Sequence, residues 1–551
     1  MKVLIVGGYG TFGGRLVDLL LGESRLTIFV AGRNLTAARA FSAERQGAAT
    51  LVPLELDRSN CGALLRKVKP DLVVDASGPF QVYGNDPYKL VRDSLAVGSN
   101  YIDLADGADF VAGISVLNDV ALQSGRFALS GMSSFPVLTA AVVRKLAKGM
   151  ESFDEIAAGI APSPYAGVGL NVIRAIASYS GKPVKILEDG VWRDGTGFFD
   201  SRRYVVNVPG EVPLRSIRFA LTDVPDIKVL SWDWRHVKSI WMGAGPTPAL
   251  LHSLLWLAAG LVKMRLLPSL LPLAPLMNWV INTVRWGEHR GGMFVEVKGP
   301  TSKRSWHLLA EGEGGSYIPS MAAEAIIRKC LAGQRPKSGA RSGHLDLELE
   351  DYAPLLAKHG IKTGIREENE ATKSLSIYEK VMGEAFARLA PPLQDFHRRK
   401  SSFSMQGKAE VVHGKSLASR LVGKLFGFPA AGENVEVIVN IDVVPRGEIW
   451  IRIFGQSRFS SRQSLGCGRH EGLIVESFGP LNFVMAVVEE GGKLLLKLRG
   501  WSCLGLLLPN CLMPTSTAFE HGAEGRFNFD VDIGLPMVGR IVRYTGWLEH
   551  K

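Results

Sequence analysis

The chain has 551 residues, of which 46% are hydrophobic and 21% charged, and its formal net charge is +11. This composition excludes a chain that is disordered as a whole, and the length allows roughly three to four domains. The basic residues are scattered along the sequence, so the charge favours anionic ligands or surfaces and predicts no nucleic-acid partner.

The five cysteines are widely spaced and form no Cys-x-x-Cys pair, which predicts neither a disulfide framework nor a metal site. The sequence opens directly on an apolar strand pattern, without the charged leader and cleavage site of a secretory signal. We therefore expect the protein in the reducing cytoplasm.

The first 130 residues alternate apolar runs of strand length with helical patterns. This alternation predicts a Rossmann-type, doubly wound parallel sheet of the α/β class, with strands that are apolar on both faces. The expected strands are residues 2–8, 26–32, 50–56, 71–78, 100–106 and 126–131. The expected helices between them are residues 10–22, 35–47, 59–69, 86–98 and 109–125.

The hydropathy pattern of the sequence changes after the first domain. Longer and more polar strand candidates at 152–164, 202–221, 293–299 and 304–312 predict an inserted α+β domain. A helix at 318–333 is expected to return to the first domain.

The last part of the chain has a third pattern of predicted elements. A helix at 377–399 precedes successive strand patterns joined by glycine-containing turns, which predicts a separate β-rich domain. The predicted divisions are an NADP-binding domain at 1–135, a substrate or oligomerisation domain at 136–335, a linker at 336–374 and the β-rich domain at 375–551.

The segment 247–284 is strongly apolar, but Lys263, Arg265 and several prolines divide it into pieces too short to span a bilayer. Two interpretations stay open. The segment is either buried, in the core or between the subunits of a homodimer, or it lies on a membrane surface as two short helices. The second would place the protein peripherally at the inner face of the membrane.

The stretch "KVLIVGGYGTFGGRLVDLLL" carries a glycine motif between a predicted strand and a predicted helix, the context of a dinucleotide-binding turn. It reads as Gly-x-Gly-x-x-Gly from Gly8 or as Gly-x-x-Gly-x-x-Gly from Gly7. Glycines allow the backbone to approach the pyrophosphate, and the helix N-terminus offers free N–H groups. The residues expected around the pyrophosphate are Gly7, Gly8, Gly10, Thr11, Phe12 and Gly13.

Arg33 stands where NAD-binding folds commonly place an acid, so it predicts a contact with the 2′-phosphate and favours NADP over NAD. Asn34 would add a neutral donor, and Asp57 is expected to reach the adenine edge. For the nicotinamide half we expect the segment after the fourth strand, Ser77, Gly78, Pro79 and Phe80.

The sequence has no Tyr-x-x-x-Lys dyad, phosphate-binding loop, His-Glu-x-x-His helix or Gly-x-Ser-x-Gly elbow. Direct hydride transfer to a small-molecule substrate, with one proton source from the protein, remains compatible with these absences. The proton-source candidates are Asp103 and Asp106 in "YIDLADG" and His289 beside the apolar segment. For each of them a structural role is the alternative.

The motifs "GGYGTFGGRLVDLL", "VAGRN", "LELDRSN", "VVDASGPFQVYG" and "NYIDLADG" occur in order. Over residues 1–335 they give the chain a resemblance to the saccharopine dehydrogenase-like oxidoreductases. The resemblance implies an NADP-type Rossmann domain with an inserted α+β domain, and reduction of C=N or C=C bonds. The segment from 375, notably "FGPLNFVMAVV" and "RFNFDVDIGLP", resembles an uncharacterised β-rich domain fused to such proteins in bacteria.

Two functions follow as hypotheses. The first is an NADP-dependent oxidoreductase that transfers hydride to or from a C=N or C=C bond of a hydrophobic substrate. The alternative is a non-catalytic, nucleotide-sensing scaffold whose β-rich C-terminal domain binds a hydrophobic ligand.

Overall fold

The computed structural model describes residues 1–81 and 83–550, and the chain divides into two compact units. Unit 1 comprises Met1–Arg202 and Ile217–Thr363, and unit 2 comprises Arg203–Ser216 and Gly364–Lys551. The chain leaves unit 1 within β10 (Ser201–Tyr204) and returns to it at the start of β11 (Ile217–Leu221). It enters unit 2 again within β16 (Lys362–Glu368).

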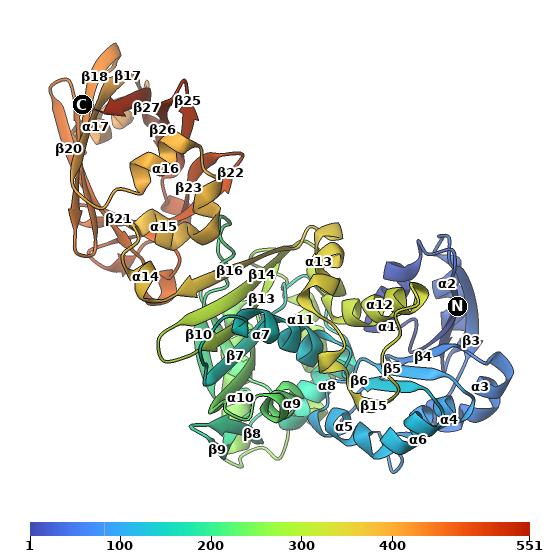
Figure 1. Ribbon diagram of the computed structural model, residues 1–551. Helices are drawn as coiled ribbons and strands as arrows, with labels where there is room; N and C mark the ends of the chain where they lie inside the picture. Colours follow the sequence, from blue (N-terminus) through green and yellow to red (C-terminus); the bar gives the residue numbers. More distant parts are fainter. Residues whose placement is uncertain (82, 551) are drawn as a thin grey trace. The chain divides into compact units, whose positions relative to one another are not determined.

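The first sheet of unit 1 is parallel, with seven strands in the order β15-β6-β5-β4-β1-β2-β3 (Figure 1). All six strands expected in the first 130 residues are present, which confirms the Rossmann-type sheet. The order reverses between β1 and β4, the switch point where such sheets bind ligands. The strands are β1 (Lys2–Val6), β2 (Thr27–Gly32), β3 (Thr50–Glu55), β4 (Leu72–Asp75), β5 (Asn100–Asp103), β6 (Phe127–Ser130) and β15 (Gly339–Ser342).

Helices connect these strands, and the first of them, α1 (Thr11–Leu20), buries an apolar stripe that includes Leu16, Val17 and Leu20. Another helix, α12 (Ile318–Leu331), packs on α1, where the Ser320 hydroxyl donates to the Phe12 carbonyl at 2.9 Å. The other helices associated with this sheet are α1 (Thr11–Leu20), α2 (Leu35–Ala43), α3 (Gly62–Val68), α4 (Lys89–Ala96), α5 (Ala108–Gly113), α6 (Asn118–Gln123), α7 (Thr139–Ala147) and α13 (Leu349–Lys358).

The second sheet of unit 1 is mixed. Its central order is β11-β12-β7-β13-β14, and only β12 and β7 among these neighbours run parallel. A hairpin of β8 and β9 pairs with β12. The strands are β7 (Glu155–Ala161), β8 (Pro183–Glu188), β9 (Val191–Thr196), β11 (Ile217–Leu221), β12 (Ser239–Ala244), β13 (Arg290–Lys298) and β14 (Lys303–Glu311), with helices α8 (Leu170–Tyr179) and α9 (Asp226–Asp233).

The apolar segment 247–284 forms two helices, α10 (Ala249–Lys263) and α11 (Ala274–Thr283). Their inner residues pack on α8 in a small core that includes Ile173, Val262 and Ala274. Within residues 1–81 and 83–550, every helix falls short of the length and apolar character that crossing a bilayer would require.

Unit 2 contains an antiparallel sheet in the order β22-β21-β20-β19-β18-β17-β27-β26-β25-β23-β24. Because β22 pairs with both β21 and β23, the sheet closes on itself. A separate β-rich C-terminal domain is thereby confirmed. The strands are β17 (Phe403–His413), β18 (Gly432–Val444), β19 (Gly447–Phe454), β20 (Ser457–Leu465), β21 (Ile474–Phe478), β22 (Leu481–Glu490), β23 (Lys493–Cys503), β24 (Leu506–Leu507), β25 (Thr515–Ala523), β26 (Arg526–Leu535) and β27 (Gly539–His550).

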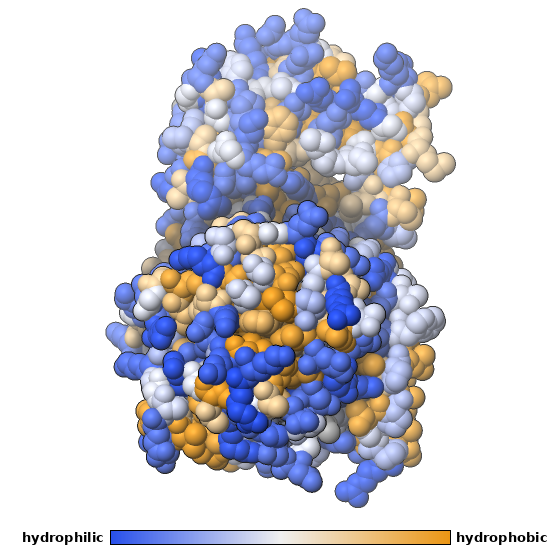
Figure 2. Space-filling view, turned by 90° about the vertical axis from the view of Figure 1, so that its right-hand side faces the viewer, coloured by the Kyte–Doolittle hydropathy of each residue, from blue (hydrophilic) through white to orange (hydrophobic). Residues whose placement is uncertain are grey.

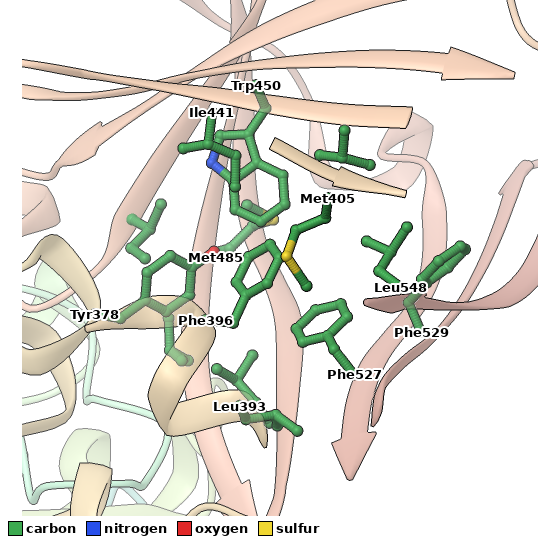
Figure 3. Packing of buried hydrophobic residues seen from close by; sticks show 14 of the residues in the cluster. Tyr378, Leu393, Phe396, Met405, Ile441, Trp450, Met485, Phe527, Phe529 and Leu548 are labelled. Atoms are coloured by element: carbon green, nitrogen blue, oxygen red, sulfur yellow. The ribbon is translucent and has the colours of Figure 1, made fainter. Parts of the chain in front are cut away.

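Two short helices of unit 2, α15 (Ile377–Met382) and α16 (Pro391–His397), contribute side chains to the core of this sheet. Figure 3 shows Tyr378 and Phe396 from these helices against Trp450 and Phe527 from the strands. The rings of Phe396 and Phe527 stack with centroids 4.1 Å apart. The remaining helices of unit 2 are α14 (Glu370–Lys373) and α17 (Leu417–Leu425).

Three segments differ from the sequence-based expectation. The strand expected at 202–221 is divided into β10 and β11, and Arg203–Ser216 belong to unit 2. The stretch expected to be a linker, 336–374, carries β15, α13 and β16, and its β15 pairs with β6 at the end of the first sheet. The helix expected at 377–399 is interrupted after α15, where Gly383 has a φ of +54°, and resumes at Pro391. A positive φ cannot continue a right-handed helix.

Candidate functional site

A glycine turn follows β1 and faces the end of β4. Gly7 has a φ of +76°, and a Cβ there would lie 2.8 Å from the Ala76 carbonyl oxygen, so only glycine fits. Gly10 is the N-cap of α1, and a Cβ on Gly13 would lie 2.2 Å from the Gly7 oxygen. These three positions are the glycines of the Gly-x-x-Gly-x-x-Gly spacing, and they shape the turn. Gly8 instead packs against the β1 and β2 backbone.

The N-terminus of α1 opens towards a cavity. Gly10 provides no side-chain cap, so N–H groups of the first helical turn are available to an anion, and the helix dipole adds a partial positive charge. Of the six residues expected around a pyrophosphate, Gly7, Gly10, Thr11 and Phe12 line the cavity, whereas Gly8 and Gly13 lie outside its lining.

The ends of β2 and β3 contribute Arg33 and Asp57, which both line the same cavity. Arg33 is exposed, and its charge and, more strongly, the hydrogen bonds from Ser59 lower the pKa of Asp57. The Asn34 side chain instead caps α2 by accepting from the Ala37 amide at 3.0 Å, outside the cavity lining. Arg33 is therefore the accessible cation on this side of the cavity's glycine turn.

The segment after β4 holds the four residues expected near a nicotinamide ring, and Ser77, Gly78, Pro79 and Phe80 all line the cavity. The Asn171 amide donates to the Gly78 carbonyl at 2.7 Å and so ties this segment to α8. Phe80 packs against an aromatic cluster, with its ring centroid 4.7 Å from that of Tyr83.

Sequence reasoning missed a polar cluster beneath this segment. Asp75, at the end of β4, is fully buried and accepts hydrogen bonds from Ser77 Oγ at 2.6 Å and Tyr83 Oη at 3.0 Å. Burial raises the pKa of the Asp75 carboxyl. The Arg58 guanidinium lies 3.0 Å from the Tyr83 ring centroid. The only sequence signal was the place of Asp75 at a strand's carboxyl end.

Asp103, a predicted proton-source candidate, is fully buried at the end of β5 and outside the cavity lining. Its Oδ1 accepts from Ser130 Oγ and from the amides of Ala105 and Gly131, at 2.8–3.0 Å. Burial raises the pKa of Asp103 to about 7, although these three donors act in the opposite direction. This geometry holds the turn after β6 in place.

Asp106 lines the cavity and accepts a hydrogen bond from Gln81 Nε2 at 3.1 Å. A second carboxyl, Asp223 after β11, also lines the cavity and was not found from sequence. Burial raises the pKa of both acids, and the neighbouring Asp223 charge raises that of Asp106 further. Two carboxyls whose pKa values are raised by burial thus face one cavity, beside Tyr179.

His289, the third candidate, lies near the surface outside the cavity lining, with its side chain 42% exposed. Its Nε2 is 3.4 Å from Glu313 Oε1, and its ring packs on Tyr165 with centroids 4.6 Å apart. His289 therefore does not share the cavity lining with Asp106.

The cavity has a volume of about 1200 Å³ and lies wholly within unit 1. One part is formed by the glycine turn and the ends of β2, β3 and β4. The other part is an apolar arm between α8, α10 and α11, lined by residues such as Ile173, Ile176, Leu251, Leu255, Met277 and Ile281. One cavity thus joins an anion-binding turn to an apolar space. Among the residues that the structure describes, no group of three or more His, Cys, Asp or Glu side chains is placed to hold a metal ion.

Comparisons with known proteins agree with this division of the chain. Residues 389–548 match the family model described as "Domain of unknown function (DUF4166)". No curated protein matches the sequence.

Three solved structures are among those that the comparison with known structures found similar to this chain. Apo saccharopine dehydrogenase (L-Glu forming) from Saccharomyces cerevisiae is 12% identical, with 67% of this chain and 99% of that one covered and a TM-score of 0.47. WlbA (WbpB) dehydrogenase from Thermus thermophilus, in complex with NAD and alpha-ketoglutarate, is 12% identical over 61% and 90%, with a TM-score of 0.29. Biliverdin reductase from Synechocystis sp. PCC 6803, in complex with biliverdin and NADP+, is 13% identical over 65% and 98%, with a TM-score of 0.29.

The chain thus has the parallel sheet and glycine turn of the dinucleotide-binding fold class. The C-terminal third carries the match to the DUF4166 family model.

Proposed function

We propose that unit 1 is an NADP-dependent oxidoreductase of the saccharopine dehydrogenase-like type, acting on a C=N or C=C bond of a hydrophobic small molecule. The observation that carries the proposal is the single cavity in which the glycine turn and the apolar arm meet. The bound nicotinamide cofactor would supply or accept the hydride.

The residues around the turn fit such a cofactor. Gly7 leaves a space that a Cβ would fill, so a pyrophosphate can approach the backbone there, and the N-terminus of α1 favours its charge. Arg33, an exposed cation on the cavity wall, suits a 2′-phosphate, which a carboxylate at the same place would repel. Ser77, Gly78, Pro79 and Phe80 would lie along the nicotinamide half.

Asp106 is our choice for the proton source. Reduction of a C=N or C=C bond requires one proton besides the hydride, and a general acid must be protonated at working pH. The raised pKa of Asp106 favours that form, and its position on the cavity lining gives it access to a bound molecule. Asp103 and His289 lie outside the lining, so we assign them no contact with the substrate.

The alternative function, ligand binding inside the C-terminal domain, is not favoured by the packing of unit 2. Phe396, Leu393 and Tyr378 from α15 and α16 occupy the interior of the closed sheet and pack against its strands (Figure 3). A ligand would compete with these side chains for the same space.

Nucleotide titration tests the proposal. We expect the wild-type chain to bind NADPH more tightly than NADH, measured by the change in nucleotide fluorescence, and Arg33→Asp to reverse the preference. Arg39→Asp is the matched control, because Arg39 is an exposed arginine on α2 outside the cavity lining. Equal binding of both nucleotides by wild type and by the Arg33 variant would refute the assignment of Arg33.

A further inference from the structure

The outer surface of α10, of α11 and of the turn between them is apolar. We name it the apolar rim and define it by six exposed residues, Leu254, Leu257, Met264, Leu266, Leu276 and Trp279. The side chains of Met264, Leu266 and Trp279 are 69%, 64% and 63% exposed. Figure 2 shows one face of the molecule, on which apolar residues gather in patches among hydrophilic ones. Such patches mark interaction surfaces more often than packing defects.

Poor packing of α10 and α11 is not the reason why the rim is exposed. Both helices bury an inner face on α8, where Val262 of α10 and Ala274 of α11 belong to one small core. At the end of α10, Arg265 has a φ of +60° and the Leu266 amide donates to the Leu261 carbonyl at 2.9 Å. This tight turn holds Met264 and Leu266 at the surface on a defined backbone.

The charged residues within the segment that carries the rim are all positive. Residues 247–287 contain Lys263, Arg265 and Arg285 and no aspartate or glutamate. Two of these cations directly flank Met264 in the turn, and all three are exposed. Exposed apolar side chains, a tryptophan and nearby cations are the combination that binds the headgroup region of an anionic bilayer.

The rim is also continuous with the cavity. Leu254 and Leu276 are more than half exposed, and both line the cavity together with Leu273. These residues connect the rim to the arm between α8, α10 and α11. An apolar molecule that enters the arm from a surface bound to the rim therefore passes along apolar side chains.

We propose that the apolar rim docks on an anionic phospholipid surface and that the hydrophobic substrate enters the cavity from the bilayer through it. The entry step rests on the proposed function, while the docking does not. A second copy of the chain is a poorer occupant, because a two-fold interface brings the same patch to both sides. Lys263, Arg265 and Arg285 would then face one another with no carboxylate in the segment to pair with them.

Vesicle flotation of the full chain tests the docking. The probes are vesicles of phosphatidylcholine alone and of equimolar phosphatidylcholine and phosphatidylglycerol, at low and high salt. We expect flotation with the anionic vesicles at low salt and its loss at high salt, since screening weakens the attraction. Lys263→Gln with Arg265→Gln should weaken binding roughly tenfold to hundredfold. Arg235→Gln, an exposed cation outside the segment, is the control and should bind as wild type does.

A second pair of variants separates the apolar contribution. Met264→Asn with Leu266→Asn should abolish flotation, whereas Val116→Asn should not, although Val116 is 72% exposed elsewhere in unit 1. These positions lie in no core, so loss of folding is not expected, and an unchanged melting temperature checks this. Flotation of the rim variant as well as wild type would overturn the proposal. The proposal would also be overturned if the wild type did not bind anionic vesicles and formed a dimer that Leu266→Asn converts to a monomer. The rim would then be a dimer interface.

The two proposals fail separately. Nucleotide titration of the same samples needs no vesicle, and flotation needs neither nucleotide nor substrate. A chain that binds NADPH through Arg33 but does not float refutes only the docking. A chain that floats but binds no nucleotide refutes only the proposed function.

Discussion

Gly13 lies so close to Gly7 that a Cβ atom on Gly13 would be 2.2 Å from the Gly7 carbonyl oxygen. The contact is backbone against backbone, so no side chain can move aside. Gly13→Ala must therefore shift α1 away from the glycine turn, and we expect loss of nucleotide binding together with a melting temperature lowered by several degrees. Gly22→Ala is the control, because a Cβ there meets nothing within 4 Å. Unchanged NADPH binding in the Gly13 variant would contradict this geometry.

Asp106→Asn keeps the size of the side chain and removes the acidic proton. With a substrate found by screening hydrophobic C=N and C=C compounds for NADPH consumption, we expect kcat to fall by about 10²–10⁴-fold. The affinity for NADPH should stay as in wild type, because Asp106 is not among the residues that we assign to the pyrophosphate or the 2′-phosphate. In wild type the rate should decline as rising pH deprotonates Asp106, and this decline should be absent in the variant. Asp119→Asn, exposed on α6, is the control.

Asp103 makes stability depend on pH. Burial raises its pKa to about 7 in the folded protein, so the fold retains a proton that the unfolded chain releases near its ordinary value. The stabilisation is complete below about pH 4 and is lost as the pH rises through about 7. When the pH is raised from about 5 to about 8, the free energy of unfolding of wild type should therefore fall by about 2–3 kcal/mol more than that of Asp103→Asn. Urea unfolding at both pH values measures this, and equal losses in the two proteins would refute it.

His397 and Glu520 form a buried pair in unit 2, with Nε2 and Oε2 2.5 Å apart. Removing the imidazole leaves the carboxylate buried without its partner, so we expect His397→Ala to lower the free energy of unfolding by about 3–5 kcal/mol. Arg540→Ala, which breaks the exposed pair with Asp532, should change it little. Urea unfolding of the full chain, followed by tryptophan fluorescence, compares the two variants. Similar midpoints would show that the buried pair is no more important than the exposed one.

The sequence was sufficient for the elements whose signals are local. Six of the seven strands of the first sheet lie in apolar runs bounded by glycine or a polar residue, and all six were found; β15, with the sequence Gly-Ala-Arg-Ser, carries no such signal and was taken for part of a linker. The single helix expected at 377–399 was wrong, because its apolar spacing continues across Gly383 while the backbone does not.

The same limit applies to the site. Arg33 and Asp57 could be proposed because each follows directly on a strand of a recognisable motif. Asp223 belongs to the second sheet and reaches the cavity only through the packing of that sheet on the first domain's loops. Arg58 and Tyr83 likewise meet only in three dimensions. Residues that are brought together by tertiary structure leave no periodic or spaced pattern in the sequence.

The place of β15 at the edge of the first sheet has a consequence for biosynthesis. On the ribosome, β6 is made long before β15, and almost all of the second sheet is translated between them. At about 5–20 residues per second, the β6 edge waits roughly ten to forty seconds for its partner strand. During that time its N–H and C=O groups form an open template for other nascent chains. Translation speed through residues 131–338 thus sets how long the newborn protein is exposed to misassembly.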